Sequence, residues 1–188
     1  MTLSMYDRQD RVMVFIDLRN MTKSVKMDSQ FSRLDFEFLV NYLLFGRKLL
    51  AAYIFDSKGV LETDDRSRAF HDLLRYKGFR VIARDSFDVE RDEQKEVDVA
   101  MACQIVVHAL RDNYDTAIVV SGDRDFIPAI QEVQAAGKKV EVAAFSKHMA
   151  KEMRRAADKY YELDDVPLLS LSNYYAEESA SDAKEENQ

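Results

Sequence analysis

The sequence predicts an α/β domain in which a central, mainly parallel sheet of about five strands lies between two layers of helices. Three observations point to this class. Short, almost continuous apolar runs alternate with longer amphipathic stretches, a spacing that implies helical crossovers between parallel strands. Apolar residues make up 47% of the 188 residues, which is enough for one full core. Two prolines and five glycines interrupt the chain, and no internal repeat is evident.

The expected elements follow one another regularly. The run "RVMVFID" (11–17) is typical of a strand buried on both faces, and "LDFEFLVNYLLFGRKL" (34–49) contains a helix with its apolar residues at helical spacing. The stretch "KYYEL" (159–163) is either a last short strand or a turn. The other strands are expected over 49–56, 79–84, 116–120 and 139–145, and the other helices over 64–78, 95–112, 125–137 and 146–158.

Charge is distributed unevenly along the chain. Residues 161–188 hold eight acids and one base, which leaves 26 of each in the first 160 residues. We therefore expect an N-terminal extension over 1–10, one neutral domain over 11–163 and an acidic, solvated tail over 164–188. The net charge of −7 thus does not exclude a nucleic-acid partner for the domain.

Targeting signals are not evident. The run "LLAAYIF" is far shorter than the roughly 20 residues of a membrane span, and the polar N-terminus lacks the apolar core of a signal peptide. The single cysteine, Cys103, has no internal disulfide partner. We expect a cytoplasmic protein.

Carboxylates gather where strands are expected to end. Asp17 ends the first strand with Asn20 close behind it, Asp98 lies near the start of the long helix, and Asp123 and Asp125 follow the fourth strand. In a parallel sheet these positions share the edge where ligands bind. Oxygen ligands favour Mg²⁺ or Mn²⁺, whereas the three scattered histidines offer no zinc site. Such ions can activate water for phosphodiester cleavage.

Each of these residues also has a structural interpretation. Asp123 or Ser121 could cap the helix that follows them, and Asp17 could belong to a turn. Asp98 could be a favourable acid near a helix N-terminus, and Lys95 a solvated lysine. What favours a functional site is their convergence on one edge of the sheet.

Basic residues are expected near these acids, as binding of phosphate requires. Arg124 lies between two of the acids, where it either holds a phosphate or pairs with a carboxylate. A late helix carries Lys147, Lys151, Arg154 and Arg155. The sequence therefore supplies cations on the same side of the predicted fold.

Three stretches carry a resemblance to a known family: "VFIDLRN", "KEVDVAMA" and "AIVVSGDRDFIPAIQEVQAAGKKVEV". With these motifs, residues 11–163 resemble the NYN domain family, in the LabA-like branch of the PIN-like nucleases. The resemblance implies a three-layer, Rossmann-like (PIN-like) fold and a ribonuclease that depends on Mg²⁺ or Mn²⁺. RNA, single-stranded rather than duplex, is then the expected partner.

The resemblance also implies residue roles. Catalysis and metal binding would fall to Asp17, Asp98, Asp123 and Asp125. The supporting and substrate-binding residues would be Asn20, Lys95, Gln104, Ser121 and Arg124. The chain departs from the family pattern at two positions, because Leu18 stands where glycine is frequent and Gln104 stands where a second acid is frequent. Loss of that acid weakens the case for a second metal ion.

Other functions stay open. The main alternative is a non-catalytic module that binds RNA or protein and retains the fold with a weakened metal site. A phosphatase with a D-x-D nucleophile is disfavoured because Arg19 occupies the position of its second acid. Topoisomerase–primase-like domains pair D-x-D with a glutamate that ends an earlier strand, where this chain has Asp17. A homodimer is compatible with the sequence.

Overall fold

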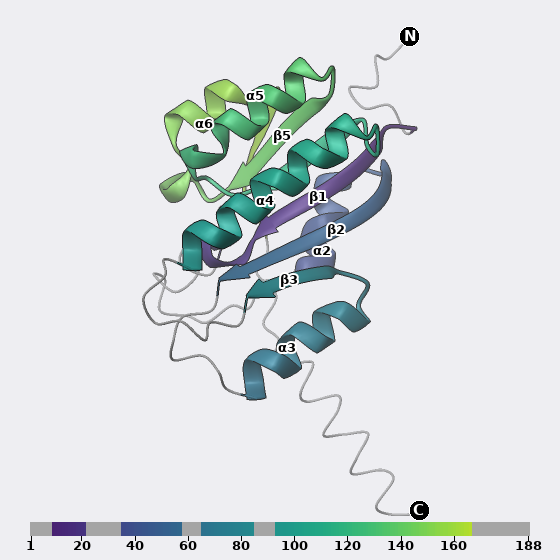
Figure 1. The fold of residues 1–188 in the computed structure, drawn as a ribbon, viewed down its shortest axis with the longest axis vertical. Coiled ribbons are helices and arrows are strands. Elements are labelled where there is room, and N and C mark those ends of the chain that lie inside the picture. Colours follow the sequence, from purple (N-terminus) through teal and green to yellow (C-terminus); the bar gives the residue numbers. More distant parts are fainter. Residues whose placement is uncertain (1–8, 22–34, 58–64, 85–92, 167–188) are drawn as a thin grey trace, which may run out of the picture.

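The computed structural model describes residues 9–21, 35–57, 65–84 and 93–166 (Figure 1). The described part is built on a sheet of six strands, each parallel to its neighbours. The strands are β1 (Arg11–Asp17), β2 (Lys48–Ser57), β3 (Arg80–Arg84), β4 (Thr116–Val120), β5 (Lys139–Ala144) and β6 (Lys159–Glu162). The predicted acidic tail lies, beyond Val166, outside the described residues.

The predicted number of about five strands is wrong, because β6 forms a sixth. Its four residues pair in parallel with β5, and Tyr161 is buried in the core beneath them. A stretch this short holds too little alternation of apolar and polar residues to separate a strand from a turn. Pairing with β5 decides the outcome, and the sequence pattern does not contain that information.

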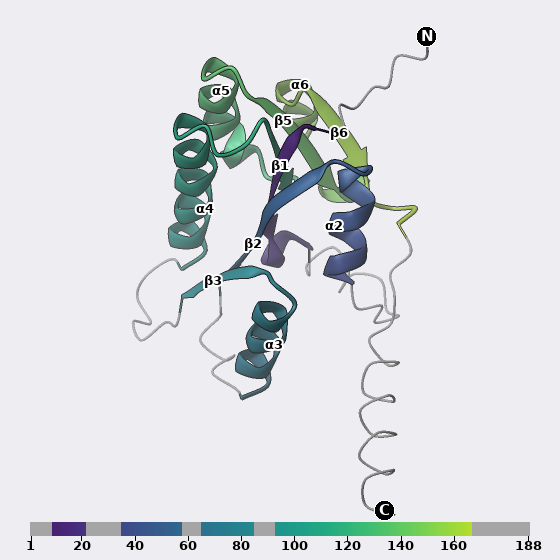
Figure 2. The same cartoon turned by 90° about the vertical axis from the view of Figure 1, so that its right-hand side faces the viewer.

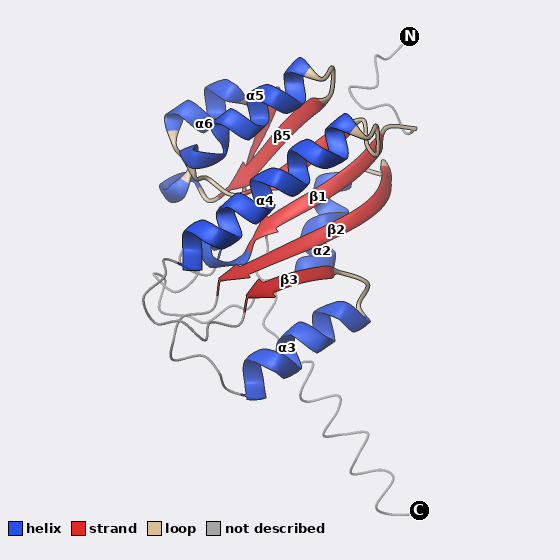
Figure 3. Cartoon of the chain, in the orientation of Figure 1, coloured by secondary structure: helices blue, strands red, loops and turns tan. Residues whose placement is uncertain are grey.

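The strands are arranged in the order β3-β2-β1-β4-β5-β6. Strands β2 and β3 therefore lie on one side of β1, and strands β4, β5 and β6 lie on the other side, so the direction of the strand order reverses between β3 and β4. In parallel sheets, ligands bind outside the carboxyl ends of the two strands that meet at such a reversal. Here those strands are β1 and β4, and Figure 3 shows the arrowheads of β1 and β2 pointing to the edge where α4 begins.

Helices cover both faces of the sheet (Figure 2). One core packs beneath α2 and α3, and the other beneath α4, α5 and α6. No helix of the described residues has both the length and the apolar character needed to cross a bilayer. The helices are α2 (Phe36–Leu44), α3 (Asp65–Tyr76), α4 (Glu93–Leu110), α5 (Ile127–Ala135) and α6 (Lys151–Ala156), with 3-10 turns η1 (Arg124–Phe126) and η2 (Ser146–His148).

Alternation along the central strands decides which face the site occupies. In β1, Val14 and Ile16 enter the core of α2, whereas Phe15 enters the core of α4 and α5. Side chains two residues apart share a face, so Asp17 points to the same side as Phe15. Ser121, the first residue after β4, follows Val119 in the same way. The sheet thus directs both polar residues toward the α4 side of its carboxyl edge.

The opposite edge of the same two strands is held by an ion pair. Arg11 at the start of β1 donates through Nε and Nη2 to the two carboxylate oxygens of Asp115, at 2.9 and 2.8 Å. The backbone N–H of Arg11 also donates to Asp115, and that of Asp115 donates to the Arg11 carbonyl at 2.8 Å. The Arg11 guanidinium lowers the pKa of Asp115 to about 2. This contact fixes β1 against β4 before the strands reach the site.

Candidate functional site

Asp17 is the most enclosed of the predicted acids, with 6% of its surface exposed. Its Oδ1 accepts a hydrogen bond from the Asn20 backbone N–H at 3.0 Å, and its Oδ2 accepts one from Ser121 Oγ at 3.1 Å. Helical backbone begins directly after Asp17, so the first bond caps that helix. The second bond joins the end of β1 to the end of β4. These bonds compensate for the loss of hydration of a buried carboxylate.

Ser121 and Asn20 extend this link into the loop after β4. Ser121 is fully buried, and its Oγ accepts from the Asp123 backbone N–H at 3.2 Å while donating to Asp17. Asn20 Oδ1 accepts from the Gly122 N–H at 3.3 Å. The structure therefore brings together Asp17, Asn20, Ser121 and Asp123 by continuous hydrogen bonding.

Asp123 caps the turn that follows it, as its structural interpretation predicted. Its Oδ1 accepts from the Asp125 backbone N–H at 3.0 Å and begins the turn η1, which Phe126 anchors by burial. Asp123 stays half-buried beside Ser121, whereas Arg124 and Asp125 are exposed. Arg124 forms no ion pair with any acid of the described residues. The expectation that it pairs with a neighbouring carboxylate is therefore not supported in this part of the chain. Capping and ligand binding are compatible, because each carboxylate oxygen has a second lone pair.

Helix α4 brings Asp98, but not Gln104, toward this edge. Val97 and Met101 are buried, and Asp98 lies half-buried on the flank of that face, while Lys95 is exposed. Gln104 follows Asp98 by six residues, a rotation of about 240° around an α-helix and about 9 Å along its axis. Gln104 thus lies on a different side of α4 from Asp98.

The oxygen donors at this edge suit a hard divalent cation that is held by only one or two protein ligands. Among the residues of known position, no three His, Cys, Asp or Glu side chains are grouped so that they could hold a metal ion. Mg²⁺, however, is bound in proteins through one or two carboxylates with retained water and substrate phosphate. Asp17 and Asp123 are the two carboxylates that such a site would use, and Ser121 Oγ joins the carboxylate of Asp17 to the backbone N–H of Asp123. Zinc is not favoured, since both ring nitrogens of His108 are hydrogen-bonded, to Tyr53 and Asn113, and His71 contacts Asp56.

One polar pair at the same edge was not predicted from the sequence. Asp56 follows Phe55, the register partner of Asp17, and therefore lies on the α2 side of the sheet. His71 of α3, 2% exposed, contacts it through Nε2 at 2.7 Å. Asp56 could have been identified in the sequence in the same way as Asp17, because each is an acid at the end of an apolar run. The pair braces α3 against the strand end, on the face opposite to Asp17.

The loop after β5 packs directly on the loop after β4. A Cβ placed on Gly122 would lie 2.0 Å from the carbonyl oxygen of His148, and the Ala150 N–H donates to the Gly122 carbonyl at 3.2 Å. This contact interrupts the helix predicted over 146–158, which instead forms η2 and α6. Ser146 donates through its N–H and its hydroxyl, both at 2.8 Å, to Asp164, and these bonds lower the pKa of that carboxyl. The start of α6 is thus fixed beside Asp123.

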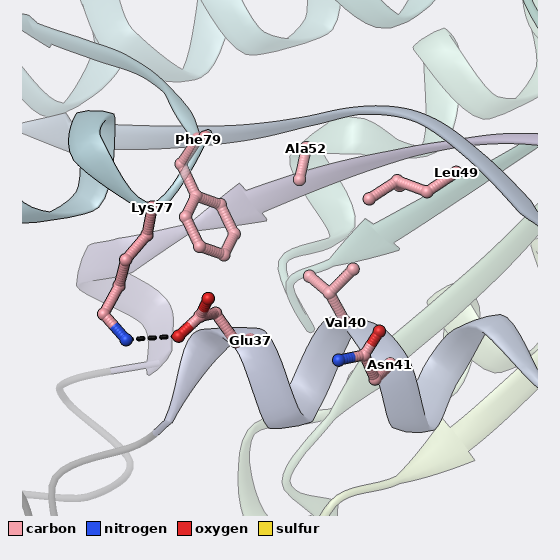
Figure 4. Close-up of a pocket in the computed structure, with 8 residues that line it drawn as sticks. Glu37, Val40, Asn41, Leu49, Ala52, Lys77 and Phe79 are labelled. Carbon is pink, nitrogen blue, oxygen red and sulfur yellow. Dashed lines mark hydrogen bonds and ion pairs between the residues drawn. The ribbon is translucent and has the colours of Figure 1, made fainter.

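A surface hollow of about 170 Å³ lies elsewhere, between α2, β2 and the turn before β3 (Figure 4). Glu37 and Lys77 form an ion pair across it, and Phe79 and Val40 supply apolar walls. Leu49 and Ala52 belong to the first half of β2, away from the carboxyl ends of the strands. The hollow therefore does not coincide with the acids, whose site is an open edge.

Comparison with known proteins addresses the identity of the fold and the motifs. The Low amplitude and bright protein LabA of Synechococcus elongatus is 25% identical over 164 residues, which cover 85% of this chain and 87% of that protein. A crystal structure of a protein of unknown function from Vibrio parahaemolyticus has the same fold, with a TM-score of 0.73 at 23% identity, covering 87% of this chain and 99% of the other. The NYN domain pattern matches residues 11–164. The resemblance seen in the sequence is confirmed, and the chain belongs to the NYN domain family, with LabA-like character.

Proposed function

We propose that this chain is a metal-dependent endoribonuclease acting on single-stranded RNA at the carboxyl edge of its sheet. One observation carries the proposal: the hydrogen-bonded chain from Asp17 through Ser121 to Asp123, which joins the ends of the two central strands. Membership of the NYN domain family, a group of PIN-like nuclease folds, supports the same reaction class. The free cysteine, Cys103, suits the reducing cytoplasm, which we propose as its location.

Each residue of this edge would have a separate role in phosphodiester hydrolysis. Asp17 and Asp123 would hold Mg²⁺ or Mn²⁺, with Asp98 approaching from α4. A bound ion of this kind supplies an activated water and charge stabilisation at the phosphate. Ser121 fixes the carboxylate of Asp17 by its hydrogen bond, and Asn20 holds the Gly122 loop in place. Arg124, exposed next to Asp123, is available to neutralise a phosphate.

A second candidate is a module that binds RNA or protein without cutting it. Two observations favour it: Gln104 replaces an acid that is frequent in the family, and the described residues hold no group of three potential metal ligands. Binding and cleavage must therefore be measured separately.

The test is cleavage of a labelled, mixed-sequence single-stranded RNA with Mn²⁺, Mg²⁺ or EDTA. We expect wild-type protein to cut with either metal, and Asp123→Asn to cut about 10²-fold more slowly or worse, the size of effect when one transition-state-stabilising group is lost. Asp72→Asn is the matched control, because Asp72 is an exposed acid of α3, which packs on the face of the sheet opposite to Asp17. Circular dichroism checks that each variant folds.

Equal cleavage by Asp123→Asn and wild type would contradict the proposed site. RNA retention by wild type without cleavage in any metal would support the non-catalytic module instead.

A further inference from the structure

A group of exposed cations lies on the β5 side of the acidic edge. We name it the basic patch, and its members are Arg124, Lys147, Lys151 and Arg155. Counting only the described parts of the chain, none of the four has an acidic partner within ion-pair distance. Several other cations of the described residues are paired with acids, as Arg11 is with Asp115, Arg47 with Glu141 and Lys138 with Asp112. The patch is therefore a concentration of uncompensated positive charge.

The contact between the two loops places this charge next to the acids. Lys147 and Lys151 flank the segment 148–150, whose backbone lies against Gly122. Arg124 follows Gly122 by two residues on the other loop. Because Gly122 leaves no room for a side chain, the loops cannot separate without breaking this packing. The backbone segments that carry the basic patch are thus held against the loop that contains Asp123.

Folding does not explain the patch. Arg154 shows what a structural cation on α6 looks like: it pairs with Glu162 at 2.7 Å and lies 5.0 Å from the ring centre of Tyr160 on β6. Lys151 and Arg155, four residues apart, share one face of α6, an arrangement of like charges that destabilises a helix. Glu152 precedes Arg155 by three residues and is its neighbour on the helix, yet the two side chains form no ion pair. A polyanion bound here would offset this repulsion.

We propose that the basic patch binds the phosphate backbone of RNA on one side of the bond to be cut, an inference that rests on RNA being the ligand of the acidic edge. The four cations are spread over η1, η2 and α6 and do not converge on one point, which suits an extended polyanion better than a single phosphate. The strand thus crosses α6 before or after it reaches Asp123. RNA binding by the patch needs no metal ion.

Salt dependence of binding tests this directly. A labelled single-stranded RNA is titrated with the full-length protein in EDTA at several salt concentrations. Each phosphate neutralised contributes about −0.7 to the slope of log K against log salt, so four cations predict a slope of about −2.8. The double variant K147Q/K151Q is expected to reduce the magnitude of the slope by about 1.4. The control K48Q/K139Q removes two exposed lysines that begin β2 and β5 at the opposite edge, and should leave it unchanged.

The outcomes separate this inference from the proposed function. If K147Q/K151Q binds with the wild-type slope while wild type still cleaves, the patch is not the RNA site and the nuclease stands. If the slope falls as expected but no metal supports cleavage, the patch stands and the nuclease does not. Equal retention of a poly-glutamate peptide would assign the patch to acidic protein segments and overturn RNA as its ligand.

Discussion

Gly122 is the residue at which the backbones of the two loops of the site approach each other most closely. The hydrogen bond from Ala150 N–H to its carbonyl ties the loops, and the His148 carbonyl occupies the space in which a side chain would lie. Its φ is outside the left-handed region, so the requirement for glycine here is one of space and not of backbone conformation. A single atom at this position therefore tests the rigidity of the whole edge.

Gly122→Ala is expected to lower the free energy of unfolding by about 1–3 kcal/mol, because an added carbon in a filled space forces the backbone to move. The same movement should reduce cleavage and RNA binding. Urea denaturation and the cleavage assay measure the two effects.

Gly137→Ala is the control for this substitution. Gly137 has φ +78° with nothing within 4 Å of an added Cβ, so alanine there costs about 1–2 kcal/mol of backbone strain without touching the site. We expect Gly137→Ala to lose about as much stability as Gly122→Ala and to keep the cleavage activity of the wild type. Wild-type activity in Gly122→Ala would show that the two loops need not stay in contact.

At the scale of elements, the site depends on the pairing of β1 with β4. Asp17 and Ser121 are separated by 104 residues, yet their hydrogen bond needs the two strands in one register. The pair of Arg11 and Asp115 fixes that register from the other end. Strand pairing and site geometry are consequently linked through the length of two strands.

Asp115 should make this link sensitive to acid. Its pKa of about 2 lies below the value near 3.9 of an unfolded chain, so its contribution to stability is complete above pH 4 and disappears as the pH falls through 2. Asp115→Asn is expected to lower Tm at pH 6, and the gap to wild type should narrow between pH 4 and 2. The effect is reduced by solvent, since 39% of the side chain is exposed.

The control is Asp72→Asn, which removes an exposed pair on α3 and should change Tm little at any pH. A gap between wild type and Asp115→Asn that is as wide at pH 2 as at pH 6 would mean that its charge does not stabilise the strand pair.

The limits of sequence analysis follow from the range of each interaction. Strands β1 to β5 and the placement of Asp17, Ser121 and Asp123 were predictable, because apolar runs and the residues that end them are local signals. The pairing of β6, the break before α6 and the bond between Asp56 and His71 depend on neighbours distant in sequence. The separation of Gln104 from Asp98 was calculable from their spacing, but only once α4 was known to run unbroken past both residues.

At the scale of the whole molecule, the folded body reaches past β6. Leu163 and Val166 are buried in the core beneath α2, and the acids of residues 167–188 follow them in the sequence. The family pattern ends just before Val166, at residue 164. The acidic tail is therefore proposed to be dispensable for folding, whereas the residues just before it are required.

Truncation after Val166 is expected to leave Tm and cleavage unchanged. Truncation after Tyr160 removes three buried side chains, Tyr161, Leu163 and Val166, worth about 1.5–3 kcal/mol each for the aliphatic ones, and should unfold a domain of ordinary stability. Thermal unfolding of both proteins measures the difference. A large loss of Tm in the first would place essential contacts in the tail.

The central position of β1 has a consequence for the order of events during translation. It is the first strand of the sheet to be synthesised, but its partner in the site follows after 104 residues. At about 5–20 residues per second the ribosome needs roughly 5–20 s to deliver Ser121 after Asp17. Under the proposed function, a nascent chain therefore carries no cutting site until the ribosome has passed Ser121.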